Sequence, residues 1–338
     1  MTARLAAVLA IIVACLTAPA ANEPVLVARE VYLMGTRASL STVASTRESG
    51  RAALEGALRA LEAAERQLST WVSDSPISRL NRHPAGVPWP AERALCDLFE
   101  EIYRWRDDTG GAFDPGIGRL LEAWDIHGEG RRPSELEVTA ALTVSGLGKL
   151  DFDRVRCTLT RTSDMTIDIG AFGKGEALDR AAVTLGLAPW MIDLGGQVSV
   201  GGLRAGDPPW TVGIAEPRNR ERAYLTVSMR EGSLSTSAGS ERDVIVGGTR
   251  VGHILDPATG HPAPFSGSVT VWHQRGLAAD ALSTALFVMG PDKGLAWAMA
   301  RGISACYLIP IGDTVQVRAT PAFSRLLTPE SARLTGPE

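Results

Sequence analysis

Residues 168–175 read DIGAFGKG and join two kinds of predicted structure. The sequence predicts a short strand over 165–169 and a helix over about 173–186. Small residues at the junction would let a ligand reach the free amide groups of the helix N-terminus, where the dipole favours an anion such as phosphate. Lys174 adds a positive charge there. The stretch matches neither GxxxxGK[ST] nor GxGxxG, so a tight strand-to-helix turn remains the alternative.

Lysine is rare in this chain, which singles out Lys174. Only three of the 34 cationic residues are lysines, at positions 149, 174 and 293, and the simplest reason is codon composition. A compact ammonium and a forked guanidinium are not interchangeable. We therefore expect that arginine cannot fully replace lysine at position 174.

The pattern outward from this stretch predicts one composite α+β unit over 24–330, with a helical subdomain at about 50–150. The predicted strands are 24–43 (broken near Met34-Gly35-Thr36), 165–169, 190–194, 210–214, 224–229, 244–254, 267–272, 305–310 and 314–318. The predicted helices are 50–68, 91–106, one beginning at the capping box of Ser134 and Glu137, 173–186, 280–289 and 291–301.

The composition excludes two classes of protein. A net charge of −4 and a pI near 5.8 argue against nucleic-acid binding, which usually needs a basic surface. A hydrophobic content of 45% with 21% charged residues excludes a disordered chain of 338 residues.

Residues 1–20 have the layout of a secretory signal peptide. Arg4 precedes a short apolar run, and small residues follow around Ala18 and Ala20. The segment 12–15, IVAC, also resembles a lipoprotein box with Cys15 as the lipidated residue. We expect export to the periplasm, and contact with a membrane only through such a lipid anchor.

The remaining cysteines are far apart in sequence, at positions 96, 157 and 306. There is no CxxC pair, so cysteine-rich zinc sites are excluded. One disulfide could form in an oxidising compartment, but three small buried residues are the favoured interpretation.

A second group of polar residues, Asp280, Ser283 and Thr284, lies at a predicted helix start. Offsets of three and four place the two hydroxyls on the side of the carboxylate. Such oxygens suit Mg²⁺ bridging phosphates. The alternative is that Asp280 merely caps the helix.

Two further segments carry candidate residues. His253, in the run 252–260 (GHILDPATG), could act as a general base, although a lone histidine is more often structural. Residues 110–115 (GGAFDP) could hold a planar heterocycle, with an ordinary helix stop as the alternative. The other four histidines show no comparable setting.

Taken in order along the chain, these motifs resemble the ApbE family of FAD:protein FMN transferases over residues of about 30–300. The matching stretches are 34–36, 69–71, 75–81, 111–114, 168–175 with Asp179, 193–196, 235–237 with Glu241-Arg242, 253–260 and 279–285.

The resemblance implies a T-fold-like α+β architecture, with antiparallel sheets flanked by helices. It also implies a Mg²⁺-dependent transfer of FMN from FAD to a serine or threonine hydroxyl of an exported or membrane flavoprotein, with release of AMP. The same metal site with water as nucleophile would give an FAD diphosphatase, and a third alternative is a non-catalytic periplasmic flavin-binding protein.

The family's functional residues carry over by motif. The resemblance places the metal at the Ala171 carbonyl, Asp280 and Thr284, with Ser283 beside them. Catalysis would depend on Lys174, Asp280 and, by our own hypothesis, His253 as the base. The residues implied to contact FAD are Met34, Trp71, Ala112, Phe113, Asp114, Asp168, Lys174 and Ile254.

Overall fold

The computed structural model describes residues 23–239 and 243–334, and its centre is an eight-stranded antiparallel sheet. In spatial order the strands are β1 (Val25–Leu33), β2 (Thr36–Ala44), β6 (Trp190–Leu194), β7 (Gln197–Gly201), β10 (Gly232–Ala238), β13 (Ser268–His273), β14 (Ser304–Ile311) and β15 (Thr314–Ala319). The N-terminal hairpin joins the later strands through the β2–β6 pair. The predicted α+β class with antiparallel sheets is confirmed.

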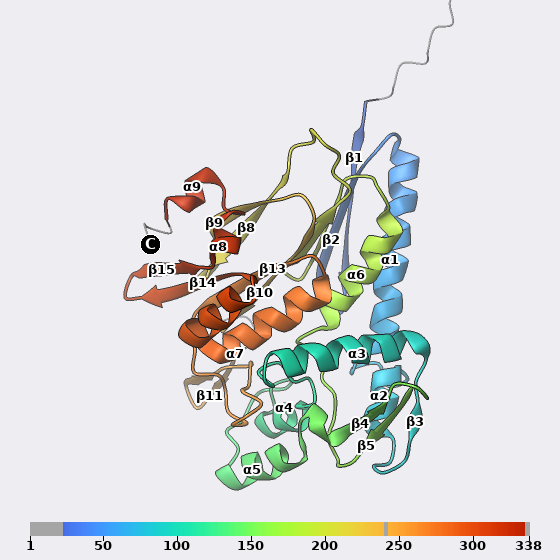
Figure 1. Cartoon of the computed structure of the whole chain (residues 1–338), viewed down its shortest axis with the longest axis vertical. Helices are drawn as coiled ribbons and strands as arrows, with labels where there is room; N and C mark the ends of the chain where they lie inside the picture. Colours follow the sequence, from blue (N-terminus) through green and yellow to red (C-terminus); the bar gives the residue numbers. More distant parts are fainter. Residues whose placement is uncertain (1–22, 240–242, 335–338) are drawn as a thin grey trace, which may run out of the picture.

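Three long helices cover one face of this sheet (Figure 1): α1 (Arg47–Leu68), α6 (Gly173–Leu185) and α7 (Gly276–Ala300). Leu54, Leu58 and Leu61 recur at helical spacing on α1 and are buried against α6 and the first strands. Each such side chain stabilises the fold by roughly 1.5–3 kcal/mol through burial. The helix predicted over 50–68 is therefore present and points its apolar face as expected.

The opposite face is covered by a hairpin of β8 (Trp210–Glu216) and β9 (Asn219–Met229), with the short helix α8 (Pro321–Ser324) beside it. Successive side chains of strand β14 point to opposite faces of the sheet, so this strand contributes to the core on both faces. Ala305 and Tyr307 pack towards α7, whereas Cys306 and Leu308 pack under the hairpin. Helix α9 (Pro329–Ala332) lies along β9 near the C-terminus.

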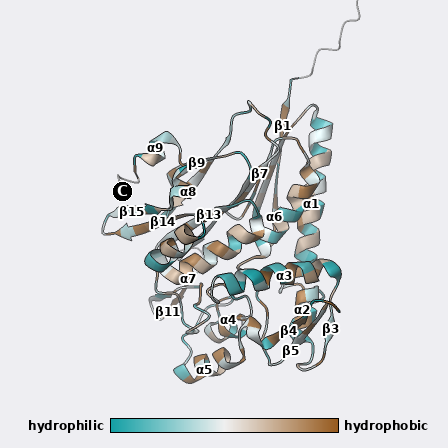
Figure 2. Cartoon of the chain, in the orientation of Figure 1, coloured by the Kyte–Doolittle hydropathy of each residue, from teal (hydrophilic) through white to brown (hydrophobic). Residues whose placement is uncertain are grey.

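Below the sheet, as drawn in Figure 1, four helices and a small sheet form a separate layer. They are α2 (Pro76–Arg82), α3 (Arg93–Asp108), α4 (Gly118–Trp124), α5 (Glu135–Val144), the 3-10 turn η1 (Leu147–Lys149), β3 (Trp89–Pro90), β4 (Leu150–Asp153) and β5 (Thr158–Arg161). The capping box predicted at Ser134 and Glu137 begins α5. In Figure 2 the side of α3 that faces the viewer is largely hydrophilic, while its leucines and Phe99 are buried.

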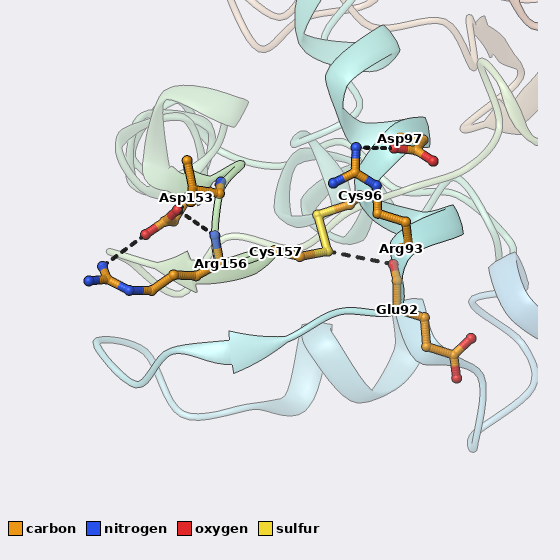
Figure 3. Close-up of a disulfide and its surroundings, with 8 residues drawn as sticks. Glu92, Arg93, Cys96, Asp97, Asp153, Arg156 and Cys157 are labelled. Carbon is orange, nitrogen blue, oxygen red and sulfur yellow. Dashed lines mark hydrogen bonds and ion pairs between the residues drawn. A yellow bond between two sulfur atoms is a disulfide. The ribbon is translucent and has the colours of Figure 1, made fainter.

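A disulfide joins this layer internally. Cys96 of α3 is bonded to Cys157, which precedes β5, across 61 residues of sequence (Figure 3). The expectation of three unpaired buried cysteines is wrong, because the fold brings α3 against the β4–β5 turn. Cys306 is unpaired and buried, as expected. Burial raises the pKa of its thiol to about 12.

Helices α6 and α7 cross at two glycines. A Cβ atom on Gly175 would lie 2.2 Å from the Gly276 carbonyl oxygen, so only glycine permits this approach. Each helix supplies a carboxylate to the other's first turn. Asp179 of α6 accepts from the Gly276 and Leu277 N–H groups at 2.6 and 3.1 Å, and Asp280 of α7 accepts from the Gly175 N–H at 3.1 Å. Two helix N-termini are thereby locked together.

Helix α7 begins at Gly276, four residues earlier than predicted, so Asp280 is not its N-cap. The cap position belongs to Arg275. The predicted helices 280–289 and 291–301 are its two halves, because Gly290 has a φ of 72° and Pro291 follows.

Among the strands, the prediction over 165–169 is wrong. Met165 and Ile167 are buried in the core under α3, but the segment joins no sheet. The predicted strand 244–254 is a small hairpin of β11 (Val244–Val246) and β12 (Thr249–Val251). Strands β7 and β10 were not predicted.

Within the described residues, no helix combines the length and apolarity needed to cross a membrane. The predicted signal segment 1–20 and Cys15 lie outside those residues. The boundary of the helical subdomain stays a prediction.

Replacing Gly175 by alanine should destabilise the α6–α7 crossing, because the new methyl group meets backbone rather than a movable side chain. We expect a loss of about 1–3 kcal/mol in the free energy of unfolding, measured by chemical denaturation. The matched control is Gly56→Ala on α1, where the nearest atom lies at 3.9 Å and alanine should be neutral or stabilising. A Gly175→Ala protein as stable as wild type would contradict this packing.

Removing the disulfide should lower stability by about 2–4 kcal/mol, because the reduced chain gains loop entropy on unfolding. The measurement compares the melting temperature of wild type with that of Cys96→Ser/Cys157→Ser. Reductant should lower the melting temperature of wild type and leave that of the double variant unchanged. Equal sensitivity of the two proteins would argue against the bond.

Candidate active site

A cleft runs along the start of α6 and consists of adjoining cavities. The first, of about 150 Å³, lies between α6, α7, β10 and the segment after β12. The second, of about 590 Å³, extends from it towards the β1–β2 turn and the end of α1. A third, of about 400 Å³, adjoins the second at Thr70 and Trp71. The first two share Ile126, His127, Asp168, Gly170 and Lys174.

The α6–α7 crossing brings Lys174 and Asp280 together in the first cavity. The Lys174 Nζ atom lies 3.3 Å from Asp280 Oδ1, and Ser235 Oγ lies 3.4 Å from the same oxygen. The Asp280 side chain is only 4% exposed and that of Lys174 is 24% exposed. This buried carboxylate is therefore balanced by one ammonium and by the first turn of α6.

The first turn of α6 is contacted by an anion of the chain itself, the carboxylate of Asp280. Its Oδ2 atom accepts a hydrogen bond from the buried Gly175 N–H. Binding of a phosphate by Lys174 stays a prediction.

The residues predicted to hold a metal lie near one another, and their role as ligands stays a prediction. Ala171, Asp280 and Thr284 line the same cavity. Ser283 is fully buried behind them and donates to the Asp280 carbonyl oxygen at 2.9 Å. Ser237 Oγ lies 3.0 Å from the Ser283 hydroxyl and 3.5 Å from that of Thr284. The described part of the chain contains no cluster of three or more His, Cys, Asp or Glu that could hold a metal ion.

Asp168 and Trp71 lie where the cavities meet. Asp168 Oδ1 accepts from the Gly170 N–H at 2.7 Å, and Asp168 Oδ2 lies 2.9 Å from His127 Nε2. The His127 ring meets the edge of Trp71 at 5.5 Å between centroids. Trp71 is 74% exposed, which leaves its indole free to stack on a planar ligand. Nothing local in the sequence singled out His127; it reaches the cleft only through the fold.

His253 lines the first cavity and has a carboxylate partner that sequence reasoning missed. The β11–β12 hairpin places Asp243 beside it, with Asp243 Oδ1 2.8 Å from His253 Nδ1 and 3.1 Å from its backbone nitrogen. The Arg250 Nε atom forms an ion pair with Asp243 Oδ2 at 2.9 Å. The only signal available was an acidic residue ten positions upstream, which becomes meaningful once a hairpin is recognised.

Met34 and Ile254 also reach the cleft. Met34 lies at the tip of the β1–β2 hairpin with a φ of 50°, and its N–H donates to Glu65 Oε1 at 2.8 Å. It lines the second cavity, and Ile254 lines the first.

The structure does not bring residues 112–114 to these cavity walls. Phe113 is fully buried in the core, and Ala112 packs against it. Asp114 Oδ1 accepts from the Gly116 and Leu147 N–H groups at 2.8 and 2.9 Å. Burial raises the pKa of the Asp114 carboxyl, and those two bonds oppose the rise. A role for the three residues in binding FAD stays a prediction.

Acid–base groups gathered in one cleft place the chain among enzymes of mixed α+β fold. Residues 34–307 match the model of the ApbE family, and the chain belongs to that family.

Relatives of known function agree in length and fold. The chain is 30% identical over 279 residues to the FAD:protein FMN transferase of Salmonella typhimurium, covering 79% of both proteins. It is 32% identical over 285 residues to that of Treponema pallidum, covering 77% of both. The crystal structure of the ApbE protein of Thermotoga maritima superposes with a TM-score of 0.81 at 29% identity, covering 89% of this chain and 99% of that one. For apo flavinyl transferase ApbE of Pseudomonas stutzeri the TM-score is 0.80 at 28% identity, with 93% and 98% covered.

The contacts of Asp114 predict a structural contribution. Asp114→Ala leaves two buried N–H groups without their acceptor and removes one of the two carboxylates paired with Arg106, and should cost about 2–4 kcal/mol of stability. Asp114→Asn keeps an oxygen at the Oδ1 position and should cost less. Both are measured by urea denaturation, together with FAD affinity by calorimetry. Unchanged stability with lost FAD affinity would instead make Asp114 a ligand contact.

Proposed function

We propose that this chain transfers the FMN part of FAD to a serine or threonine hydroxyl of an acceptor flavoprotein, releasing AMP, with Mg²⁺ as cofactor. Membership of the ApbE family and relatives named FAD:protein FMN transferase support the flavin transfer. The observation that carries the rest is the meeting of Lys174 and Asp280 in a cleft that continues to an exposed tryptophan.

The reaction replaces the phosphoanhydride bond of FAD by a phosphate ester bond to the acceptor. The acceptor oxygen bonds to the phosphorus on the FMN side of the diphosphate, and the bond from that phosphorus to the bridging oxygen breaks. AMP leaves with the bridging oxygen, and the hydroxyl proton passes to a base. Lys174 stabilises the negative charge that accumulates on the phosphate oxygens and the leaving group.

The donor set fits Mg²⁺. Ala171 supplies a carbonyl, Asp280 a carboxylate and Thr284 a hydroxyl, all hard oxygen ligands on one cavity. The Lys174 ammonium beside Asp280 indicates that this carboxylate attracts a cation in the folded protein. When bound, the ion would neutralise diphosphate charge. Ser283 would orient the helix turn that carries these ligands, since it bonds to the Asp280 carbonyl oxygen.

The large second cavity suits the ring systems of FAD. Trp71 offers an aromatic face, while Met34 and Asp168 line the same space. Ile254 and His253 line the first cavity, which adjoins the second. His253 would then take the acceptor's proton.

We also propose that the mature protein acts in the periplasm. The signal-like segment 1–20 supports export, with Cys15 as an optional lipid attachment. The Cys96–Cys157 bond supports an oxidising compartment. The acceptor is accordingly an exported or membrane flavoprotein.

Incubating the mature protein with FAD, Mg²⁺ and an acceptor domain carrying a Ser/Thr flavinylation motif tests this function. Intact-mass spectrometry should show the acceptor gaining one FMN less water, with an equal amount of AMP in solution. Free FMN and AMP with an unlabelled acceptor would indicate an FAD diphosphatase. Binding of FAD without turnover would indicate a non-catalytic flavin-binding protein.

Two substitutions test the charged pair. Asp280→Asn keeps the shape of the side chain and its bond to α6, but should abolish the dependence of turnover on Mg²⁺ and reduce the rate by 100-fold or more, on the order of other electrostatic sites. Lys174→Arg should slow turnover about 10- to 100-fold, because a planar fork replaces a point charge. Lys293→Arg, on the exposed part of α7, is the matched control and should be silent. Full activity in Lys174→Arg would mean that lysine is not required there.

A further inference from the structure

The pairing of Asp243 with His253 depends on the β11–β12 hairpin. Asp243 directly precedes β11, and His253 lies two residues beyond β12, with Val244 opposite Val251 in register. The hairpin therefore holds the two side chains together from ten residues apart. Asp243 is buried, with a side chain 4% exposed, whereas His253 at 19% keeps one side on the cavity.

The hydrogen bonds of Asp243 define which nitrogen of His253 carries the proton. A carboxylate only accepts, and its Oδ1 already receives the His253 backbone N–H. The Nδ1 atom at 2.8 Å from the same oxygen must therefore be the protonated one. In the neutral ring, Nε2 is then the nitrogen able to take a proton.

The other oxygen of Asp243 is fixed as well. Its Oδ2 atom forms an ion pair with Arg250 Nε at 2.9 Å, so both carboxylate oxygens have a partner on the hairpin or directly after it. Lys174 and Asp280 line the same cavity as His253. His253 and the Lys174–Asp280 pair thus line one cavity although they come from separate elements.

We propose that Asp243 is a positioning residue for the transfer, an inference that rests on the proposed function. Asp243 holds the Nδ1–H tautomer of His253, so that Nε2 accepts the proton of the acceptor hydroxyl as its oxygen bonds to the FMN phosphorus. The bond to the bridging oxygen breaks and AMP leaves with it. Asp243 then balances the positive charge on the imidazolium until the proton passes to solvent.

Asp243→Asn is the variant that tests this role. An amide has one accepting oxygen where the carboxylate has two, so its NH₂ group faces either Arg250 or the His253 N–H. The substitution keeps the size of the side chain but weakens the preference of His253 for the Nδ1–H tautomer. We expect kcat to fall about 100- to 10,000-fold, with the KM for FAD within about twofold of wild type. Asp313→Asn, in the exposed β14–β15 turn, is the matched control and should be unchanged.

Nitrogen-15 NMR of histidine-labelled protein gives a readout that needs no turnover. Wild type should show His253 protonated at Nδ1 and unprotonated at Nε2, assigned by comparison with His253→Gln. The Asn variant should show the two tautomers mixed. An Nε2–H tautomer in wild type would overturn the proposal, as would a kcat within a few-fold of wild type in Asp243→Asn.

These results separate the inference from the function it rests on. If wild type labels no acceptor, the proposed function fails, and the NMR spectrum still tests whether Asp243 sets the tautomer. If wild type transfers FMN and the Asn variant loses activity only in proportion to its folded fraction, measured by circular dichroism, Asp243 is merely structural and the inference is wrong.

Discussion

The reciprocal contact between the first turns of α6 and α7 is the constraint on which the rest of the site depends. Each helix N-terminus needs acceptors for its free N–H groups, and each receives a carboxylate from the other helix. The exchange requires the two backbones to touch, which Gly175 and Gly276 allow. Gln197 of β7 reinforces the crossing, because its Nε2 atom donates to the Gly276 carbonyl oxygen at 2.9 Å.

The same contact creates the chemistry of the cleft. Residues more than a hundred positions apart, Lys174 and Asp280, become neighbours because each lies within one turn of the crossing. The Asp179 carboxylate binds the first turn of α7 and has a purely structural role, whereas the Asp280 carboxylate binds the first turn of α6 and also lines the cavity. Burying a carboxylate costs free energy unless a cation is paired with it. The buried position of Asp280 therefore favours a bound cation, which is the Lys174 ammonium in this structure and, in our proposal, a metal ion when the substrate is bound.

The sequence could predict those parts of the fold that depend on local pattern. The leucine spacing of α1, the capping box of α5 and the offsets that bring Asp280 and Thr284 to one side of a helix are all local, and the structure has them. Membership of the ApbE family likewise followed from the order of short motifs.

What sequence reasoning missed depends on distant packing. Strand β10 reads as polar, yet its serines are buried, with Ser233 bonded to Ser199 and Ser235 to Asp280. Conversely, 165–169 looks like a strand, but its apolar residues pack into the core without a ladder partner. His127 and Asp243 gain their roles only from partners that the fold supplies. The Cys96–Cys157 pair could not be chosen from spacing because 61 residues separate them.

The most direct measurement is a crystal structure of the protein with FAD and Mn²⁺ in place of Mg²⁺, with the metal located by anomalous scattering. We predict one strong peak within coordination distance of Asp280 and Thr284, next to the FAD diphosphate, with the Lys174 ammonium on a phosphate oxygen instead of on Asp280. A metal bound elsewhere, or a diphosphate far from an intact Lys174–Asp280 pair, would contradict the assignment of this cleft as the site of FMN transfer.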